Sequence, residues 1–411
     1  MAIIKPFKCI RPAVDKAKDV AALPYDVYNR QEACDEVKDK PLSFLNIDRA
    51  ETQFDSSVDT YDERVYAKAK ELLETRMNDG TFEQEQKDCY FIYSLTMDGR
   101  EQTGLVACAS IDDYINNVIK KHENTREEKE IDRIKHVDTC GAQTGPIFLA
   151  YRADKVINDV IIKNKKNAPM FDFVADDGVR HAAWKIDNGS DINILQNEFG
   201  KIDSIYIADG HHRAASAVKV GLKRRNEKNN YTGDEEFNYF LSVLFPDEEL
   251  MIMPYNRCVK DLAGNTTDEF IKKVGEKYDV EDNGTTPYQP DKKGDVGMYI
   301  DSKWYILHPK KEILSDDPVE GLDVSVLQNN VLAPVLGIED PRTDSRIDFI
   351  GGIRGLKELE RRCADDMKVA FAMYPTSIKE LFDVADAGRL MPPKSTWFEP
   401  KLRSGLFIHA L

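Results

Sequence analysis

Apolar and polar residues recur along this chain with the spacings of short strands and amphipathic helices. Residues 61–78 place apolar side chains on one stripe at helical spacing, which predicts a helix that ends before Gly80. Residues 89–96 and 103–109 are rich in β-branched and aromatic residues and flank Asp98-Gly99, a pair typical of hairpin turns. The pattern therefore predicts a helix followed by a β-hairpin.

The same criteria predict further elements without a regular βα alternation. Leu-Pro-Tyr-Asp-Val at 23–27 is expected to be extended chain, because the residue before a proline is biased away from helix. The mixture favours an α+β fold over a doubly wound sheet, with a weakly marked domain boundary near residue 240. Strands are expected at residues 147–151, 204–208 and within 239–259, a hairpin at 298–307, and helices at 129–139, 214–225, 268–279 and from 323 to just before Pro334.

Composition and charge narrow the classes of function. The 411 residues include 57 Lys+Arg against 73 Asp+Glu, a formal charge of −16, which argues against a general nucleic-acid coat. A local basic pocket for one small phosphate ligand remains compatible with that charge. Seven scattered cysteines form no CxxC pair and suggest neither a zinc knuckle nor a disulfide framework. The N-terminal residues indicate neither a signal peptide nor a membrane span, so we expect a cytoplasmic protein with no nucleic-acid or membrane partner.

The strongest chemical signal is Ala-Asp-Gly-His-His-Arg at 208–213, where a predicted strand meets a predicted helix. Asp209 is suited to cap the helix, and Gly210 permits a tight turn and the close approach of a ligand. The positive end of the helix would attract a phosphate, and His211, His212 and Arg213 add donors there. We therefore predict that residues 210–213 bind phosphate or a nucleotide. The alternative is a capped helix whose histidines only satisfy nearby carbonyls.

A second cluster, residues 121–125, combines a cation, an imidazole, a carboxylate and a hydroxyl in Lys-His-Glu-Asn-Thr. Such a set can deprotonate a substrate alcohol or hold a metal, although a solvated helix face explains the same charges. We expect Glu123 to act as the general base, with His122 and Thr125 beside the substrate. Asp209 competes for the role of base and is the candidate metal ligand.

Two further segments carry candidate residues, each with an equally good structural explanation. Asp26 could be presented from a loop to a substrate, or could only form a turn. The string Met-Pro-Pro-Lys-Ser-Thr-Trp-Phe-Glu-Pro-Lys at 391–401 suits a rigid loop over a polar ligand, with Lys394, Ser395 and Thr396 contacting phosphate. A proline-stiffened tail packed on its domain explains that string as well.

Taken together, these segments resemble a bacterial and archaeal family catalogued as domain of unknown function number one thousand and fifteen. Asp-Gly-His-His-Arg is also similar to the ligand loop of the partition-protein-B and sulfiredoxin superfamily, which includes nucleotide-dependent free serine kinases. The matching strings follow one another in order: Pro-Phe at 6–7, Leu-Pro-Tyr-Asp-Val at 23–27, His-Glu-Asn-Thr at 122–125, Gly-Pro-Ile-Phe at 145–148, Ala-Asp-Gly-His-His-Arg at 208–213 and the string at 391–401.

The resemblance implies a partition-protein-B/sulfiredoxin-like core in residues 1–240 and a C-terminal α+β domain in residues 241–411 whose tail returns to the site. It places the phosphate chain on residues 209–213 and lets an acidic residue elsewhere activate a substrate hydroxyl. One string departs from the family pattern, because the chain reads Pro-Tyr-Asn-Arg at 254–257 where the family usually shows a Pro-Thr-His-Arg-like string. Asn256 cannot act as acid or base, whereas Arg257 is kept as a candidate substrate contact.

Three hypotheses for function follow. The first is an enzyme that transfers a phosphoryl group from a nucleotide or pyrophosphate-type donor to a small hydroxyl metabolite, with free L-serine as the best single acceptor. Its catalytic candidates are Glu123, Asp209 and His212, with Mg²⁺ held by Asp209 and phosphate oxygens and no permanently bound cofactor. The second is a non-catalytic nucleotide-binding regulatory module. The third and weakest is a metal-dependent phosphodiesterase.

Overall fold

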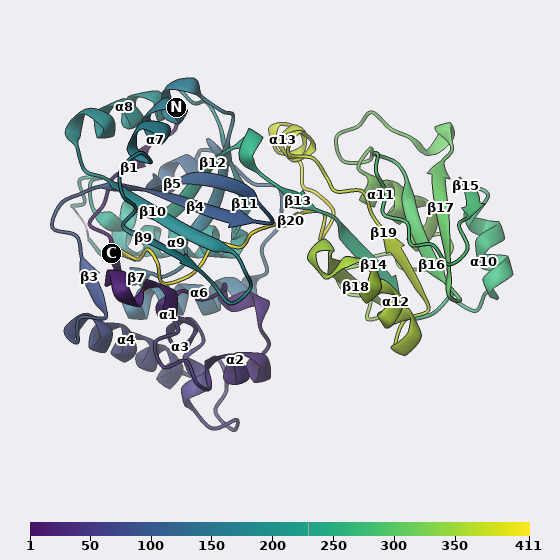
Figure 1. The fold of residues 1–411 in the computed structure, drawn as a ribbon, viewed down its shortest axis with the longest axis horizontal. Helices are drawn as coiled ribbons and strands as arrows, with labels where there is room; N and C mark the ends of the chain where they lie inside the picture. Colours follow the sequence, from purple (N-terminus) through teal and green to yellow (C-terminus); the bar gives the residue numbers. More distant parts are fainter. Residues whose placement is uncertain (229) are drawn as a thin grey trace. The chain divides into compact units, whose positions relative to one another are not determined.

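The computed structural model describes residues 1–228 and 230–411, and the chain divides into two compact units. Unit 1 comprises Met1–Leu250 together with Pro400–Leu411, and unit 2 comprises Met251–Glu399. The division falls later than residue 240 because strand β12 (Tyr239–Pro246) pairs inside the sheet of unit 1. The C-terminal segment belongs to unit 1, so unit 2 is an insertion between two parts of unit 1 (Figure 1).

Unit 1 is built on a mixed sheet of nine strands among the described residues. Its strands are β1 (Ile4–Lys5), β4 (Tyr90–Met97), β5 (Arg100–Ser110), β6 (Ile119–Lys120), β8 (Ile147–Tyr151), β9 (Phe171–Val174), β10 (Arg180–Ile186), β11 (Ile205–Asp209) and β12. The order is β6-β11-β8-β12-β5-β4-β10-β9, and β1 pairs with β5 off this path. The predicted hairpin is β4–β5, and the predicted strand at 147–151 is β8.

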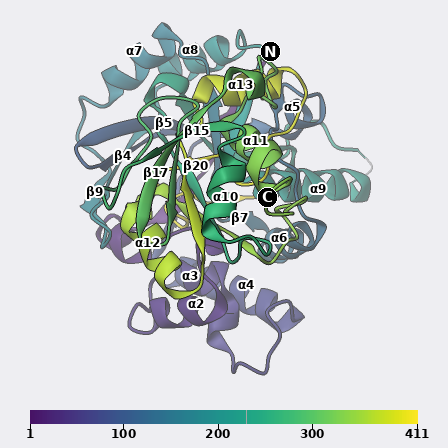
Figure 2. The same cartoon turned by 90° about the vertical axis from the view of Figure 1, so that its right-hand side faces the viewer.

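The helices of unit 1 contribute to two hydrophobic cores, one shared with the sheet and one separate from it. They are α1 (Ala17–Val20), α2 (Arg30–Val37), α3 (Leu45–Asp48), α4 (Glu63–Asn78), α5 (Ile111–Ile115), α6 (Glu127–Cys140), α7 (Lys155–Asn164), α8 (Gly189–Phe199) and α9 (His211–Glu227). Apolar side chains of α7, α8 and α9 share one core with the sheet, whereas α3 and α4 build a second core that includes Ile408 of the returning tail. Figure 2 shows α7 and α8 at one end of unit 1 and α2, α3 and α4 at the other.

Short strands attach the ends of the chain to the rest of unit 1. Strand β2 (Ile10–Pro12) pairs with β3 (Phe82–Gln84), and β21 (His409–Ala410) pairs with β7 (Ala142–Gln143). The C-terminal segment is therefore held by backbone hydrogen bonds as well as by its buried apolar side chains.

Unit 2 contains an antiparallel sheet of six strands among the described residues, in the order β15-β17-β16-β19-β14-β18. The strands are β14 (Tyr255–Val259), β15 (Tyr278–Asp282), β16 (Val296–Ile300), β17 (Lys303–Pro309), β18 (Ile347–Gly351) and β19 (Val369–Ala372). The helices are α10 (Thr267–Val274), α11 (Asp323–Leu327), α12 (Gly355–Asp365) and α13 (Ile378–Asp386). A separate pair, β13 (Ile252–Met253) and β20 (Trp397–Phe398), lies next to the points where the chain enters and leaves unit 2.

The fold is α+β, as predicted, and three local predictions need correction. The helix predicted at 268–279 ends at Val274, because Gly275 ends it and the following residues form the edge strand β15. The string at 23–27 is not extended throughout. Residues Tyr25–Val27 form a 3₁₀ turn closed by the amide of Val27 on the carbonyl of Pro24. The helix predicted from residue 323 is α11 followed by a π-helical turn at Gln328–Leu332.

None of the described helices is long and apolar enough to cross a membrane.

Candidate functional site

The junction between β11 and α9 carries the Asp-Gly-His-His-Arg string, and its cap differs from the prediction. Gly210 is the residue that caps the helix, in the left-handed region at φ 92°, and no side chain caps it. The prediction that Asp209 caps α9 is therefore wrong, because the chain turns through Gly210 after the carboxylate. The first amide to donate within the helix is that of Ala214, to the carbonyl of Gly210. The amides ahead of it belong to the first helical turn, where an anion is favoured.

The carboxylate of Asp209 lies between two cations instead. Its Oδ2 is 3.4 Å from a terminal nitrogen of Arg213 and 3.9 Å from Nζ of Lys401. Burial raises the pKa of Asp209, but Lys401, Arg213 and His211 outweigh this effect and lower it to about 2. Asp209 is therefore ionised at neutral pH and orients both cations at the start of α9. The tail string was expected to bring a lysine to an anion site, and Lys401 lies at the start of α9 beside Asp209.

The guanidinium of Arg213 is held in place from two sides. One terminal nitrogen donates to the carbonyl of Pro146 at 2.5 Å, and the other faces Asp209. Its Nε is buried and has no hydrogen-bond partner in the described part of the chain. A Cβ atom at Gly210 would lie 3.0 Å from that Nε. The absence of a side chain at Gly210 thus keeps the guanidinium close to the backbone, where it can still donate to a ligand.

Two buried imidazoles meet beside the same turn. The rings of His122 and His211 pack edge to face with centroids 4.5 Å apart. Burial lowers the pKa of His122 to about 4, although Asp209 and the backbone of Ile207 raise it. Burial also lowers the pKa of His211 well below its usual range, and His122 lowers it further. Both rings are neutral at pH 7. Nδ1 of His122 and Nε2 of His211 are buried without a hydrogen-bond partner among the described residues.

Glu123 approaches the buried pair from the solvent side. Its Oε2 is 3.9 Å from Nδ1 of His211, and 45% of its side chain is exposed. Because His211 also feels the charge of Asp209, the structure brings Glu123, Asp209 and both histidines into one neighbourhood.

His212 lies on the neighbouring side of the helix. Its Nε2 accepts a hydrogen bond from the backbone amide of Arg126 at 3.0 Å, so only Nδ1 is left to donate to a ligand. Burial lowers the pKa of His212, while the charges of Asp26 and Glu130 raise it, which places Asp26 near this ring. The hydroxyl of Thr125 donates to Glu130 rather than to Glu123. The predicted contact of Thr125 with a substrate stays a prediction.

The remaining candidate residues lie in unit 2 and gather there. The guanidinium of Arg257 is 3% exposed and donates to the carbonyl of Lys394 at 3.1 Å. Burial lowers the pKa of Arg257 to about 10. The hydroxyl of Ser395 donates to the carbonyl of Pro392 at 2.6 Å. Arg257, Lys394 and Ser395 thus form one local arrangement with neighbouring Thr396, and their predicted role in phosphate or substrate binding stays a prediction.

A small cavity lies beside Arg213 within unit 1. It measures about 30 Å³, and its lining includes Arg213, Gly145 and Ser404. Four of its lining residues, Tyr25, Asp48, Arg133 and His136, also line a cavity of about 260 Å³. Asp48, Arg133 and His136 do not belong to the candidate set predicted from the sequence, because no local pattern marks a charged or titratable side chain that only burial makes significant.

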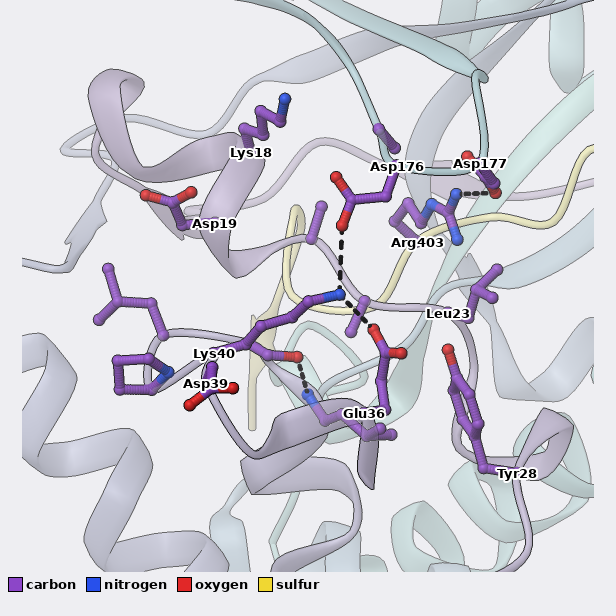
Figure 3. A pocket seen from close by; sticks show the side chains of 17 residues that line it. Lys18, Asp19, Leu23, Tyr28, Glu36, Asp39, Lys40, Asp176, Asp177 and Arg403 are labelled. Carbon is purple, nitrogen blue, oxygen red and sulfur yellow. Dashed lines mark hydrogen bonds and ion pairs between the residues drawn. The ribbon is translucent and has the colours of Figure 1, made fainter. Parts of the chain in front are cut away.

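Another cavity in unit 1, of about 620 Å³, does not contain the candidate residues (Figure 3). Lys40 bridges Glu36 at 2.7 Å and Asp176 at 3.1 Å, and Arg403 is paired with Asp177. Five carboxylates and three cations line this cavity. A surplus of carboxylates makes it unsuited to a phosphate chain.

The described residues include no group of three or more His, Cys, Asp and Glu side chains arranged to hold a metal ion. Asp209 by itself can supply one carboxylate oxygen. This is enough for Mg²⁺ where phosphate oxygens and water complete the octahedron. The arrangement as a whole offers helix amides, imidazole and guanidinium nitrogens for an anion, and two carboxylates near them.

Comparison with protein families assigns the chain. The family model described as "Protein of unknown function (DUF1015)" matches residues 4–325. The chain belongs to this family. The DUF1015 match covers Arg257 of unit 2 and the candidate residues of unit 1 other than Lys401. It ends before the tail string at 391–401. None of the curated proteins matches the sequence.

Several solved structures are distantly similar. A free serine kinase in complex with AMP is 16% identical over 72% of this chain and 86% of its own, with a TM-score of 0.33. SbnI with a C-terminal truncation, from Staphylococcus aureus, is 11% identical over 72% of this chain and 82% of its own, with a TM-score of 0.39. A conserved hypothetical protein from Pyrococcus furiosus is 15% identical over 73% and 93%, with a TM-score of 0.33. At these TM-scores the neighbours carry no functional argument.

Proposed function

We propose that this protein is a small-molecule kinase that transfers a phosphoryl group from a nucleotide or pyrophosphate-type donor to a hydroxyl metabolite. The observation that carries the proposal is the Nε–H of Arg213 at the start of α9, a buried donor without a hydrogen-bond partner among the described residues. Nε2 of His211, also buried and unpartnered there, adds a second donor when the neutral ring carries its proton on that nitrogen. A buried donor without a partner costs about 1–3 kcal/mol. An anion on the first turn of the helix relieves that cost and meets the positive end of the helix dipole.

The carboxylates distinguish a kinase from a binding module. A site that only binds a nucleotide needs cations and amides, whereas phosphoryl transfer gains from a base for the acceptor hydroxyl. Glu123 lies near His211 and is partly exposed, so it can face both a ligand on α9 and an incoming substrate. Asp209 is already engaged by Arg213 and Lys401. The position of Glu123 beside His211 at the solvent side supports it as the base, and the position of Asp209 between two cations supports it as the residue that organises them.

The proposed step is a single displacement. The oxygen of the acceptor hydroxyl forms a bond to the terminal phosphorus of the donor, and the bond from that phosphorus to the bridging oxygen breaks. The hydroxyl proton passes to the carboxylate of Glu123, and the leaving diphosphate or monophosphate keeps the electron pair of the broken bond. Arg213, Lys401, His211 and the helix amides would stabilise the charge on the transferred group.

A divalent cation fits the donor set of this site. Asp209 would hold Mg²⁺ through one carboxylate oxygen, together with phosphate oxygens and water, and the cation would neutralise charge on the donor. L-serine is the first acceptor to test, on the resemblance of the Asp-Gly-His-His-Arg string to free serine kinases.

A product assay tests the proposal directly. The intact protein is incubated with Mg²⁺ and labelled nucleoside triphosphate, nucleoside diphosphate or pyrophosphate, against L-serine, L-threonine and glycerol. We expect one donor and acceptor pair to give a labelled phosphomonoester at a rate that disappears in Arg213→Ala and survives in Arg224→Ala. Tight nucleotide binding without any transfer to these acceptors would favour the regulatory module. If neither a nucleotide nor pyrophosphate binds, both hypotheses are overturned.

A further inference from the structure

A set of buried charges in unit 1 surrounds the cavity next to Arg213. Asp48, Asp132 and Arg133 are 4%, 7% and 7% exposed, and His136 is 3% exposed. All four line the cavity of about 260 Å³, and Asp48, Arg133 and His136 also line the small cavity that reaches Arg213. Burial of an ion is expensive, and a buried pair is weak evidence for stability. The cluster therefore calls for another explanation.

Arg133 uses only part of its hydrogen-bonding capacity within the described chain. Its Nε donates to Asp132 at 2.8 Å, and its guanidinium lies 4.0 Å from the centre of the Tyr25 ring. Asp132 also accepts from the hydroxyl of Tyr66 at 3.0 Å. Within the described residues the two terminal nitrogens of Arg133 have no hydrogen-bond partner, although a guanidinium carries five N–H donors. Asp132 binds the Nε edge of this nearly buried guanidinium, and the Tyr25 ring packs against its face. The two terminal nitrogens can therefore bind the carboxylate of a ligand with two parallel hydrogen bonds.

Acceptors lie on the same cavity. Asp48 uses one oxygen to accept from the hydroxyl of Thr144 at 2.7 Å, and its other oxygen has no hydrogen bond from the described chain. Nε2 of His136 donates to the carbonyl of Ile47 at 3.1 Å, because a carbonyl can only accept. That tautomer leaves Nδ1 of His136 as an acceptor without a partner in the described part of the chain. The cavity thus presents a double donor from Arg133 beside two acceptors.

We propose that this cavity is a subsite for a small α-amino acid, whose carboxylate is bound by the terminal nitrogens of Arg133 and whose ammonium is bound by Asp48 and His136. The volume of about 260 Å³ holds a molecule of several water volumes, at roughly 30 Å³ for each water in the liquid. The opposite charges of the ligand match the opposite charges of the cavity. Only the role of this amino acid as phosphoryl acceptor rests on the proposed function, and its binding does not.

Three matched probes test the proposal by calorimetry on the intact chain. L-serine carries both charges, ethanolamine lacks the carboxylate, and L-glycerate, which has the same configuration as L-serine, carries a hydroxyl in place of the ammonium. We expect L-serine to bind at least tenfold more tightly than either of the other two. Equal affinities for all three probes, or no measurable binding of L-serine, would overturn the proposal. No variant is needed for this comparison, so it does not depend on the folding of a mutant.

Two variants then separate the two charges of the ligand. Arg133→Lys keeps the positive charge but loses the fork, and it should weaken L-serine at least tenfold. Arg64→Lys on α4 removes an exposed guanidinium that pairs with Asp62 and should change nothing. Asp48→Asn should weaken L-serine about tenfold and leave the affinity for L-glycerate unchanged. An Arg133→Lys protein that binds ADP and L-serine like the wild type contradicts the assignment of the carboxylate.

Titration with ADP keeps this inference apart from the kinase proposal. If L-serine binds as expected while ADP does not bind and no phosphoserine forms, the subsite stands and the proposed function fails. If ADP binds and L-serine does not, the subsite fails and the phosphate site on α9 stands.

Discussion

The ammonium of Lys401 lies 3.9 Å from the carboxylate of Asp209, although the whole of unit 2 separates the two residues along the chain. The chain returns to unit 1 at Pro400, so Lys401 is the second residue after the return. Only 15% of its side chain is exposed. The start of α9 therefore receives one of its cations from the C-terminal segment, and its electrostatics depend on that segment being in place.

Lys401→Ala should weaken nucleotide binding about tenfold, since a hydrogen bond to a charged group contributes about 1.5–3 kcal/mol. Lys401→Arg should retain most of the affinity because it keeps the charge. Calorimetric titration with ATP measures both. Lys155→Ala removes an exposed lysine that pairs with Asp159 on α7 and serves as the control. Equal ATP affinity in Lys401→Ala and the control would exclude Lys401 from the phosphate site.

Arg213→Ala should weaken the same nucleotide by about 1.5–3 kcal/mol, for the loss of one charge-assisted contact. The matched control is Arg224→Ala near the C-terminal end of the same helix, where the guanidinium lies 3.5 Å from Asp138. We expect the control to bind nucleotide as the wild type does. A crystal soaked with nucleotide whose phosphates lie away from α9 would also disprove the assignment.

Gly210→Ala should affect both stability and binding. The left-handed φ of 92° costs a residue with a side chain about 1–2 kcal/mol, and the new Cβ would also press on Arg213. Gly178 has a similar φ of 82° but open space around it, so Gly178→Ala should lose only the stability that the left-handed backbone costs. Urea unfolding should show a loss of stability in both variants, whereas only Gly210→Ala should lose nucleotide affinity. Unchanged affinity in Gly210→Ala would mean that Arg213 does not need this close approach.

Local patterns predicted the elements that local physics controls. The helix at α4 follows from its apolar stripe, and β8 from a short apolar run between turn signals. Helix α2 was missed because only Ala33 of its residues is buried, so no stripe exists. A signal was nevertheless present, since Asn29 and Glu32 form a capping box at its start.

The candidate site was predictable only where it is local. The turn at Gly210 and the donors after it could be read from one string, but the expected cap was wrong because the left-handed Gly210, and not Asp209, is the residue that caps the helix. The pairing of Asp209 with Lys401, and the grouping of Asp48 with Arg133 around a cavity, join residues far apart in sequence. Such contacts depend on the packing of α6 and α9 and on the return of the tail, which no single segment encodes.

Acid should destabilise unit 1 through its buried histidines. The pKa of His122 is about 4 in the folded chain, below its usual value, so the unfolded state binds more protons between about pH 6.5 and pH 4. The stabilising contribution is complete at pH 7 and is lost as the pH falls through this window. At pH 5 the loss from His122 should be about 2 kcal/mol.

Hydrogen exchange of peptides from β11 and α9 at pH 7 and pH 5, corrected for intrinsic rates, measures this loss. In His122→Gln the difference in opening free energy between pH 7 and pH 5 should be smaller by about 2 kcal/mol, because glutamine does not titrate. A variant that keeps the full pH dependence would show that His122 does not contribute it.

The roles of the two carboxylates can be separated by isosteric variants. A hydroxyl has a pKa far above neutral, so a positioned carboxylate that takes its proton contributes roughly 10²–10⁴-fold to the rate. Glu123→Gln keeps the shape and removes the charge, and it should lose turnover by that factor while binding ATP normally. Asp209→Asn removes the partner of Arg213 and Lys401, so it should change ATP affinity as well as turnover. Single-turnover rates at saturating ATP, beside calorimetric affinities, give both quantities. If turnover survives in Glu123→Gln and disappears in Asp209→Asn with ATP affinity intact, Asp209 is the base and the assignment is reversed.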